Sequence, residues 1–465
     1  MEPSLGTLLR DRQGEDWLVG PSSQEFWRWL DQLTPGFAAY QAACPAHDAG
    51  VLMAEPDPLR FLATALAAWG ADCTVVLANP HWGHQERQQV QALVNPQWGG
   101  PIQAGFGGYP CRVPGGEAGQ LLIPTGGSSG QIKFAVHRWE TLMVAIQGFR
   151  AHFGVDPVHA YCVLPLFHVS GLMQALRVLV SGGQLALQPY GDLKAGARLA
   201  LPPGGFLSLV PTQLQDLLAQ GDDALPWLRG FRAVLLGGAP AWRSLLDQAQ
   251  AQAIPLALTY GMTETAAQVA TLLPEEFLAG HRSSGRPLPH LVLTIVDDQG
   301  RPRPAGQAGA ILIESDALAQ GYLIRPKQGA ATLAPAPPSL GTDDLGRVDA
   351  AGYLHIVGRR STKIITGGEN VFPEELEAVL LATEAVSDVC VVGLPCDRWG
   401  QQLCALVVMA PARLQDLPTL LGPQLAAYKR PKRWILVEAL PRTAQGKLSR
   451  PQAQALAQQV VGGNF

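Results

Sequence analysis

The stretch LTYGMTETAAQ, residues 258–268, decides the class of fold. An apolar run reaches Thr259 and polar residues follow it, which predicts a buried strand that ends at Thr259. Ligands of open α/β sheets lie at the carboxyl ends of strands, so the polar turn is a candidate binding site. Glu264 in this turn is a hard oxygen ligand suited to Mg²⁺ on a nucleotide. The alternative is a helix start, with Thr263 as the N-cap and the acid at the positive end of the helix dipole.

Similar apolar runs precede this stretch and end in Gly, Pro or polar residues. Helical patterns such as residues 61–69 separate them, and apolar runs of this kind suit strands buried on both faces. The expected strands lie at 73–79, 120–125, 160–166, 205–211 and 231–238. This alternation predicts an α/β fold, with a large N-terminal domain of layered α/β subdomains.

The pattern changes beyond residue 285. Residues 291–315 and 351–360 predict strands around turn-rich loops, and hence a small β-rich subdomain. In the last hundred residues we expect an amphipathic helix that begins at Pro373 and a proline-broken helical stretch at 414–430. The expected strands of this part lie at 386–395, 402–410 and 433–440. We therefore predict two domains, 1–358 and a small α+β C-terminal lid domain at 359–465.

Length and composition exclude several classes of protein. The 465 residues exceed one ordinary core, and the net charge of −4 gives no reason to expect nucleic acid or an anionic membrane as partner. The first residues lack the order of a signal peptide, and no stretch approaches the ~18 apolar residues of a membrane span. The seven cysteines form no CxxC pair, so we expect buried free thiols in the cytoplasm, with a zinc site as the weaker alternative. The sequence leaves a homo-oligomer open.

A Gly/Ser-rich loop lies in LLIPTGGSSGQIKF, residues 121–134. Its glycines let the backbone approach a ligand, and successive N–H groups in such a turn form an anion-binding concavity. Thr125, Ser128 and Ser129 add hydroxyl donors. The loop is neither a Walker A motif nor GxGxxG, and the alternative is a flexible connection.

Two further polar stretches lie near the C-terminus. Within residues 339–370, Asp344 can accept hydrogen bonds from ribose hydroxyls and Arg359 can donate to ribose or phosphate. The alternative is a polar hairpin with surface ion pairs. In PRTAQGKLSR, residues 441–450, Lys447 follows a glycine, and its alternative is a solvated charge.

Taken in this order and spacing, the four stretches resemble the adenylate-forming superfamily of acyl-CoA synthetases, adenylation domains and luciferases. The resemblance covers nearly the whole chain and implies an AMP-forming ligase that uses ATP and Mg²⁺. Lys447 would bridge the substrate carboxylate and the α-phosphate, and Thr263 with Glu264 would hold phosphate and Mg²⁺. Asp344 and Arg359 would hold the ribose.

The resemblance also assigns the rest of the nucleotide site. The residues expected at the β- and γ-phosphates are Thr125, Gly126, Gly127, Ser128, Ser129, Gly130 and Lys133. Those expected at the adenosine are Gly237, Gly238, Ala239, Tyr260 and Gly261. Ser361 occupies the hinge position, where many members have Asp or Lys, and the loop Gly367, Gly368, Glu369 and Asn370 would line the path of the CoA thiol.

Closer likeness points to one branch, the o-succinylbenzoate–CoA ligases of menaquinone and phylloquinone biosynthesis. It rests on LPLFHVSG (164–171), Arg177, TYGMTETAAQ and ITGGENVFPEELE. The helix around Arg177 is otherwise apolar except for Gln174, and arginine pairs bidentately with carboxylates. We therefore expect Arg177 to bind a second carboxylate of the substrate. The alternatives are that it reaches the surface or pairs with a structural acid. The other residues expected at the acid are His168, Ser170, Thr259 and Met262.

The expected reaction needs no general base, because a carboxylic acid is ionised at neutral pH. It needs charge neutralisation and in-line positioning at the α-phosphorus. The acyl group would then pass from AMP to coenzyme A. Two other hypotheses stay open: an aryl- or acyl-CoA ligase or stand-alone adenylation enzyme of other specificity, and a silent nucleotide-binding scaffold on the same fold.

Overall fold

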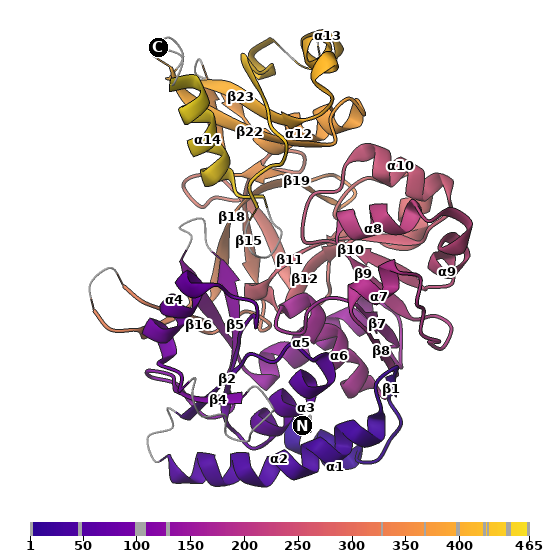
Figure 1. The fold of residues 1–465 in the computed structure, drawn as a ribbon, viewed down its shortest axis with the longest axis vertical. Helices are drawn as coiled ribbons and strands as arrows, with labels where there is room; N and C mark the ends of the chain where they lie inside the picture. The colour runs from indigo at the N-terminus through magenta and orange to yellow at the C-terminus, as the bar shows by residue number, and fades with distance from the viewer. Residues whose placement is uncertain are drawn as a thin grey trace. The chain divides into compact units, whose positions relative to one another are not determined.

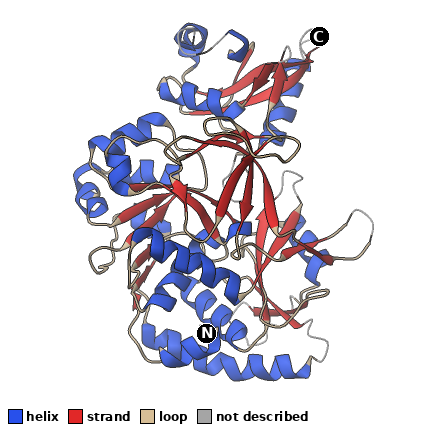
Figure 2. Cartoon of the chain, turned by 180° about the vertical axis from the view of Figure 1, so that it is seen from behind, coloured by secondary structure: helices blue, strands red, loops and turns tan. Residues whose placement is uncertain are grey.

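The computed structural model describes residues 3–44, 49–97, 108–126, 131–326, 329–366, 369–396, 400–421, 425, 427–442 and 448–462. Contacts divide the chain into two compact units. The first comprises Met1–Gly238, Gln252–Leu293 and Leu312–Leu340, and the second comprises Ala239–Ala251, Thr294–Ile311 and Gly341–Phe465. Figure 1 traces the chain through both, and Figure 2 shows how helices and strands alternate in it.

The first unit contains two sheets. In the larger, the described strands follow the order β1 (Leu18–Val19), β8 (Leu185–Leu187), β7 (Ala160–Cys162), β9 (Phe206–Leu209), β10 (Ala233–Leu236), β11 (Leu256–Met262), β12 (Ala267–Thr271) and β13 (Arg286–Pro287). Strands β1 to β11 of this order are parallel, and β12 and β13 add antiparallel to the edge. Every residue of β7, β9 and β10 is buried, as expected for parallel strands covered on both faces.

The second sheet of this unit is mixed. Its described strands follow the order β17 (Thr332–Pro335), β16 (Gly321–Ile324), β6 (Ile132–His137), β5 (Leu121–Gly126), β3 (Thr74–Leu77), β2 (Ala49–Met53) and β4 (Gly108–Arg112). Strands β5 and β6 form a hairpin that pairs Thr125 with Lys133. The Gly/Ser loop therefore joins two neighbouring strands of this sheet.

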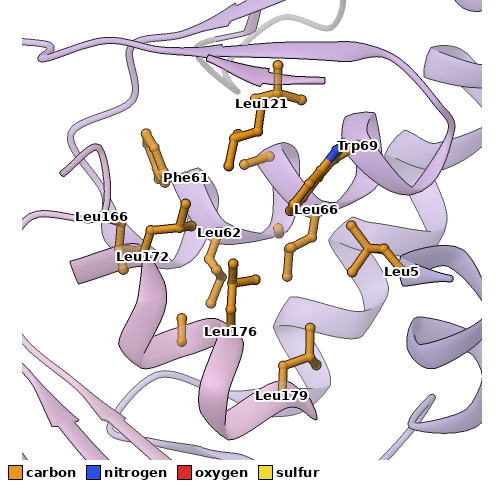
Figure 3. Packing of buried hydrophobic residues seen from close by; sticks show 14 of the residues in the cluster. Leu5, Phe61, Leu62, Leu66, Trp69, Leu121, Leu166, Leu172, Leu176 and Leu179 are labelled. Atoms are coloured by element: carbon orange, nitrogen blue, oxygen red, sulfur yellow. The ribbon is translucent and has the colours of Figure 1, made fainter. Parts of the chain in front are cut away.

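Helices fill the space around these sheets. They are α1 (Leu5–Asp11), α2 (Ser23–Ala43), α3 (Pro58–Gly70), α4 (His84–Val94), α5 (Trp139–Phe153), α6 (Val169–Ser181), α7 (Tyr190–Lys194), α8 (Pro211–Leu218), α9 (Leu225–Arg229) and α11 (Pro274–Leu278). One buried apolar cluster joins α3 and α6 to strands of both sheets. Figure 3 shows Leu172, Leu176 and Leu179 of α6 packed near Leu62 and Leu66 of α3.

This packing fixes which side of α6 carries polar residues. Leu172, Leu176 and Leu179 follow helical spacing on one face, and each fully buried leucine contributes roughly 1.5–3 kcal/mol. Gln174 and Arg177 fall on the opposite face at i and i+3. The helix also has a buried cap, since Arg12 Nη1 donates to the Leu179 carbonyl over 2.8 Å. Helix α6 is therefore held at its apolar face and at its C-terminal end.

The second unit contains the remaining helices and most residues of the remaining strands. Its β-rich part belongs to the sheet β14 (Val292–Val296), β15 (Gly309–Glu314), β18 (Ser339–Val348) and β19 (Leu354–Arg359), of which the contacts assign one end of β14, β15 and β18 to the first unit. Its C-terminal part pairs β21 (Glu369–Val371), β20 (Ile364–Thr366), β23 (Gly400–Val408), β22 (Asp388–Cys396) and β24 (Arg433–Leu436). The helices are α10 (Arg243–Ala251), α12 (Pro373–Ala382), α13 (Leu417–Leu421) and α14 (Arg450–Gly462).

The predicted α/β architecture, with a β-rich part and a C-terminal α+β part, is confirmed. Two strands differ from their predicted ends. The strand predicted at 160–166 stops at Cys162, because Pro165 has no N–H to donate and the Pro165 carbonyl instead accepts from His168 N–H in the turn before α6. The strand predicted to end at Thr259 continues to Met262, because β12 pairs with it beyond that point.

The described helices include none that is long and apolar enough to cross a membrane. All seven cysteines are free thiols, as predicted. Five are buried, whereas Cys44 and Cys396 are partly exposed, so the expectation that all are buried was wrong for these two. No cluster of three metal-binding side chains lies in the described ranges.

Candidate active site

A lysine and a glutamate predicted for the phosphates and Mg²⁺ lie together in the first unit. Lys133 Nζ on β6 lies 3.5 Å from Glu264 Oε1 and 3.8 Å from the centre of the Tyr322 ring. The Tyr322 hydroxyl donates to Glu264 Oε1 over 3.0 Å. Burial, and then the charge of Glu264, raise the pKa of Tyr322, so the phenol keeps its proton and acts as the donor. The lysine predicted for phosphate and the carboxylate predicted for the metal are thus held side by side.

The donor set around Glu264 fits a nucleotide-borne cation. Mg²⁺ usually takes one or two protein carboxylates and completes its shell with water and substrate phosphate. The Glu264 side chain is 12% exposed, and the Glu264 carbonyl accepts from Ala319 N–H over 2.8 Å. This backbone bond fixes the residue on the turn after β11, where Glu264 can reach a metal that arrives with a phosphate.

The Gly/Ser loop is described only at its two ends. Thr125 and Gly126 end β5, and Lys133 lies opposite Thr125 on β6. Gly127, Ser128, Ser129 and Gly130 lie outside the described residues.

The turn after β11 begins at a close contact between strands. A Cβ on Gly261 would lie 1.8 Å from the Ala267 carbonyl oxygen, and the register with β12 shifts between Tyr260 and Gly261. Only glycine permits this approach. Thr263–Thr265 then form a short 3-10 turn whose N-cap is Met262, so the alternative of a helix start with Thr263 as N-cap was wrong.

A buried histidine that the sequence did not single out anchors this turn. The neutral His137 ring donates through Nε2 to the Thr263 carbonyl over 2.8 Å, and Nδ1 lies 3.0 Å from Thr141 Oγ1. Burial lowers the pKa of His137 to about 4, against smaller opposing effects of the Thr263 carbonyl and Glu264. The end of β6 therefore positions the residues expected at phosphate and metal.

The predicted adenine segment follows β10. A Cβ on Gly237 would lie 2.3 Å from Thr259 Oγ1, and Gly238 has a φ of +79°. Both positions therefore need glycine, the first for space and the second for backbone conformation. The carboxyl end of β10 lies here, where its parallel pairing with β11 stops, and such strand ends are the expected ligand site of a parallel sheet. Ala239 begins the next segment, which the contacts assign to the second unit.

Arg177 is buried, with 4% of its surface exposed. Nη2 donates to Gln268 Oε1 of β12 over 2.7 Å, and the guanidinium carbon lies 4.0 Å from the Phe149 ring centre. Its Nε has no hydrogen-bond partner among the described residues, and burial lowers its pKa to about 9 with no acid nearby to oppose this. Neither alternative predicted for Arg177, a surface position or a structural acid, is found in the described part of the chain.

The other residues expected at the acid lie around α6 and β11. His168 is the N-cap residue of α6, and Ser170 in its first turn is exposed. The Ser170 carbonyl accepts from Gln174 Nε2 over 2.9 Å. Thr259 and Met262 are partly exposed on β11.

In the second unit, the two predicted ribose residues pair with each other. Asp344 on β18 lies opposite Arg359 on β19, and Arg359 Nε donates to Asp344 Oδ1 over 2.8 Å. The Arg359 side chain is 61% exposed, which leaves it accessible to a ligand, whereas that of Asp344 is 10% exposed. Ser361, at the expected hinge, bonds to the Asp343 carboxylate through both N–H and Oγ–H.

The predicted thiol path and the lysine predicted for catalysis belong to the C-terminal part of the chain. Gly367, Gly368 and Lys447 lie outside the described residues, as do the side chains of Glu369 and Asn370. The backbone of Glu369 and Asn370 pairs with β20. Arg442 and Leu448, which flank the Lys447 segment, form a β-bridge.

Two family models match the chain. One described as AMP-binding enzyme covers residues 110–323, and one described as AMP-binding enzyme C-terminal domain covers residues 375–447. The chain belongs to the family of AMP-binding enzymes, and the predicted adenylate-forming superfamily is confirmed.

The similar curated proteins bear a more particular name, 2-succinylbenzoate–CoA ligase. The chain is 35% identical to that of Enterococcus faecalis over 340 residues, which are 72% of this chain and 69% of the relative. It is 36% identical to that of Geobacillus sp. strain WCH70 over 343 residues, 72% of this chain and 68% of the relative. The predicted class of enzyme, an AMP-forming acid–thiol ligase, is thereby confirmed.

Solved structures share the fold. The o-succinylbenzoate CoA synthetase (MenE) of Bacillus subtilis, in complex with the acyl-adenylate intermediate OSB-AMP, matches with a TM-score of 0.79 at 23% identity, over 97% of this chain and 98% of that one. ATP-bound MatB of Rhodopseudomonas palustris matches with a TM-score of 0.76 at 22% identity, over 99% and 100% of the chains.

Proposed function

We propose that the protein joins 2-succinylbenzoate to AMP and then passes the acyl group to coenzyme A. The product would be 2-succinylbenzoyl-CoA, an intermediate of menaquinone or phylloquinone biosynthesis in the cytoplasm. The buried guanidinium of Arg177 carries this choice of acid, because its charge lacks a protein carboxylate among the described residues. A substrate with a second carboxylate supplies that missing partner.

The names of the curated relatives support the same substrate. Two of them, at 35% and 36% identity, are called 2-succinylbenzoate–CoA ligases. A fatty acyl chain would leave the Arg177 charge unpaired beside an apolar ligand, which is costly. An acid with one carboxylate therefore suits the buried Arg177 less well than a dicarboxylate.

The nucleotide would bind along the first unit. In this proposal Lys133 and the hydroxyl of Thr125 bind the β- and γ-phosphates, and the segment at Gly237 and Gly238 lies against adenine. Glu264 would hold Mg²⁺, which supplies neutralisation of the phosphate charge when bound. His137 keeps the Thr263 carbonyl in place and so orients the turn that carries Glu264.

The acid needs no base, so the residues act by charge and position. Arg177 would orient the substrate through the carboxylate that does not react, which leaves the other free to attack the α-phosphorus. Lys447 would neutralise the charge between the attacking carboxylate and the α-phosphate. Asp344 and Arg359 would bind the ribose.

The second half-reaction would use a different arrangement of the C-terminal domain. We place the domain boundary after residue 358, so that residues 359–465 turn about Ser361. This turn would withdraw Lys447 and bring Gly367 to Asn370 to the path of the thiol. Glycines permit close passage of the narrow pantetheine arm of coenzyme A.

Pyrophosphate release with a panel of acids, ATP and Mg²⁺ tests the choice of substrate. We expect release with 2-succinylbenzoate at a kcat/KM at least about tenfold above that for benzoate or a fatty acid. Faster pyrophosphate release with another aryl or fatty acid would refute 2-succinylbenzoate as the substrate and identify that acid instead. No release with any acid would favour the silent scaffold.

A further inference from the structure

Arg177 and His290 pack against neighbouring residues of α5, Phe149 and Gly148, and both carry buried polar atoms without partners in the described part of the chain. Arg177 Nε on α6 and both ring nitrogens of His290 are buried and have no hydrogen-bond partner among the described residues. Buried polar groups almost always have a hydrogen-bond partner in folded proteins, because a group without one loses its hydrogen bonds to water and gains no others. Such atoms on two separate segments indicate a place for a polar ligand.

The His290 ring packs directly against the backbone of α5 at Gly148. A Cβ built on Gly148 would lie 1.8 Å from His290 Nδ1, so only glycine at 148 leaves room for the ring. Glycine inside a helix is less favourable than alanine. At position 148 glycine is required because the imidazole of His290 approaches the helix backbone closely. The backbone is fixed too, since the His290 carbonyl accepts from Ser315 Oγ over 2.8 Å.

The electrostatics define what His290 can do. Burial, and then the charge of Arg177, lower the pKa of His290 to about 4, so the ring is neutral at pH 7. A neutral imidazole still donates one N–H. A guanidinium and an imidazole N–H together form a donor set for a carboxylate, whose oxygens accept from both.

We propose that His290 is a specificity-determining residue that binds, together with Arg177, the carboxylate of the substrate that does not react. The inference rests on the proposed function, because it assumes an acid with two carboxylates. It adds a second donor to the one that the sequence predicted. It also gives Gly148 a role, as the residue that makes room for the imidazole.

The test compares two acids that differ by this carboxylate. One is 2-succinylbenzoate and the other is benzoylpropionate, which lacks the ring carboxylate. For each variant, pyrophosphate release gives the ratio of the two kcat/KM values. We expect His290→Ala to lower this ratio at least about tenfold, as for loss of a hydrogen bond to a charged group. His290→Asn keeps a donor and should lose less.

Glycine variants give an independent arm. Gly148→Ala should displace the His290 ring and lower the ratio of the two kcat/KM values as His290→Ala does. The double variant, Gly148→Ala with His290→Ala, should lower this ratio no further than His290→Ala alone. Gly191→Ala is the matched control, because Gly191 also lies in a helix but a Cβ there meets nothing within 4 Å.

The outcomes separate the two proposals. A wild-type protein that does not use 2-succinylbenzoate refutes the proposed function. A wild-type protein that uses it, with a ratio for His290→Ala within about twofold of wild type, overturns the role of His290. If Gly148→Ala fails to fold by circular dichroism, the two His290 variants still decide.

Discussion

Replacing Arg177 with methionine should stabilise the fold and damage catalysis at the same time. The fall of the Arg177 pKa from 12.5 to about 9 corresponds to roughly 5 kcal/mol of uncompensated burial, at about 1.36 kcal/mol per pH unit. Against this stand the contact with Phe149, worth about 1 kcal/mol, and the hydrogen bond to Gln268, worth about 2 kcal/mol. The net expectation for Arg177→Met is a gain of about 2 kcal/mol in the free energy of unfolding.

Arg450, which is partly buried and has two acid partners, provides the control. Arg450 Nη2 donates to Glu377 Oε2 over 2.7 Å, and the same nitrogen lies 3.1 Å from Glu374 Oε1. Because Arg450→Met would leave the buried Glu377 charge unpaired, it should lower the free energy of unfolding by about 3–5 kcal/mol. The two substitutions are chemically identical and should change stability in opposite directions.

Urea unfolding followed by circular dichroism measures both variants, and pyrophosphate release measures catalysis. Arg177→Met should lower kcat/KM for 2-succinylbenzoate at least about thirtyfold, since truncating one partner of a buried charge pair costs 2 kcal/mol or more. If Arg177→Met destabilises the protein as much as Arg450→Met does, Arg177 has a structural partner and its proposed role is refuted.

Three further predictions concern the bound nucleotide and the turn after β11 that carries Glu264. Lys447→Ala should abolish adenylate formation from acid and ATP yet spare thioester formation from synthetic acyl-adenylate; equal loss of both half-reactions would contradict the two-state scheme. Glu264→Gln should raise the Mg²⁺ concentration for half-maximal pyrophosphate release at least about tenfold. Tyr322→Phe should raise the same concentration about threefold, because Glu264 loses one hydrogen bond. An unchanged Mg²⁺ dependence of Glu264→Gln would show that Glu264 does not bind the metal. Burial lowers the pKa of His137 from 6.5 to about 4, so its neutral form contributes stability that is complete above pH 6.5 and lost as the pH falls toward 4. Between about pH 7 and about pH 5 the free energy of unfolding should fall by about 2 kcal/mol because of His137. In urea unfolding the fall for His137→Gln should be smaller by this amount, and an equal fall in both proteins would show that His137 does not have this low pKa.

The strands could be predicted because their residues are mostly apolar. β9 and β10 were found within the predicted stretches, since burial on both faces leaves them apolar except for the buried Ser208 of β9. The end of β11 was predicted wrongly, because its last residues are held by pairing with β12 and carry no apolar signal of their own. Sequence patterns describe a strand by its burial and not by its partner.

The residues that hold the site in place were harder to predict than those that form it. Glu264 stands in a recognisable motif, but Tyr322, 58 residues away, touches it only because β16 pairs with β6. His137 reaches the Thr263 carbonyl across 126 residues. A single sequence carries no signal for such contacts, because the register of the strands decides them.

The most direct test of the central claim is the product. Incubation of the protein with 2-succinylbenzoate, ATP, Mg²⁺ and coenzyme A should yield 2-succinylbenzoyl-CoA and AMP in equal amounts, measured by mass spectrometry and nucleotide chromatography. AMP without the thioester, or a thioester formed only with other acids, would contradict the account.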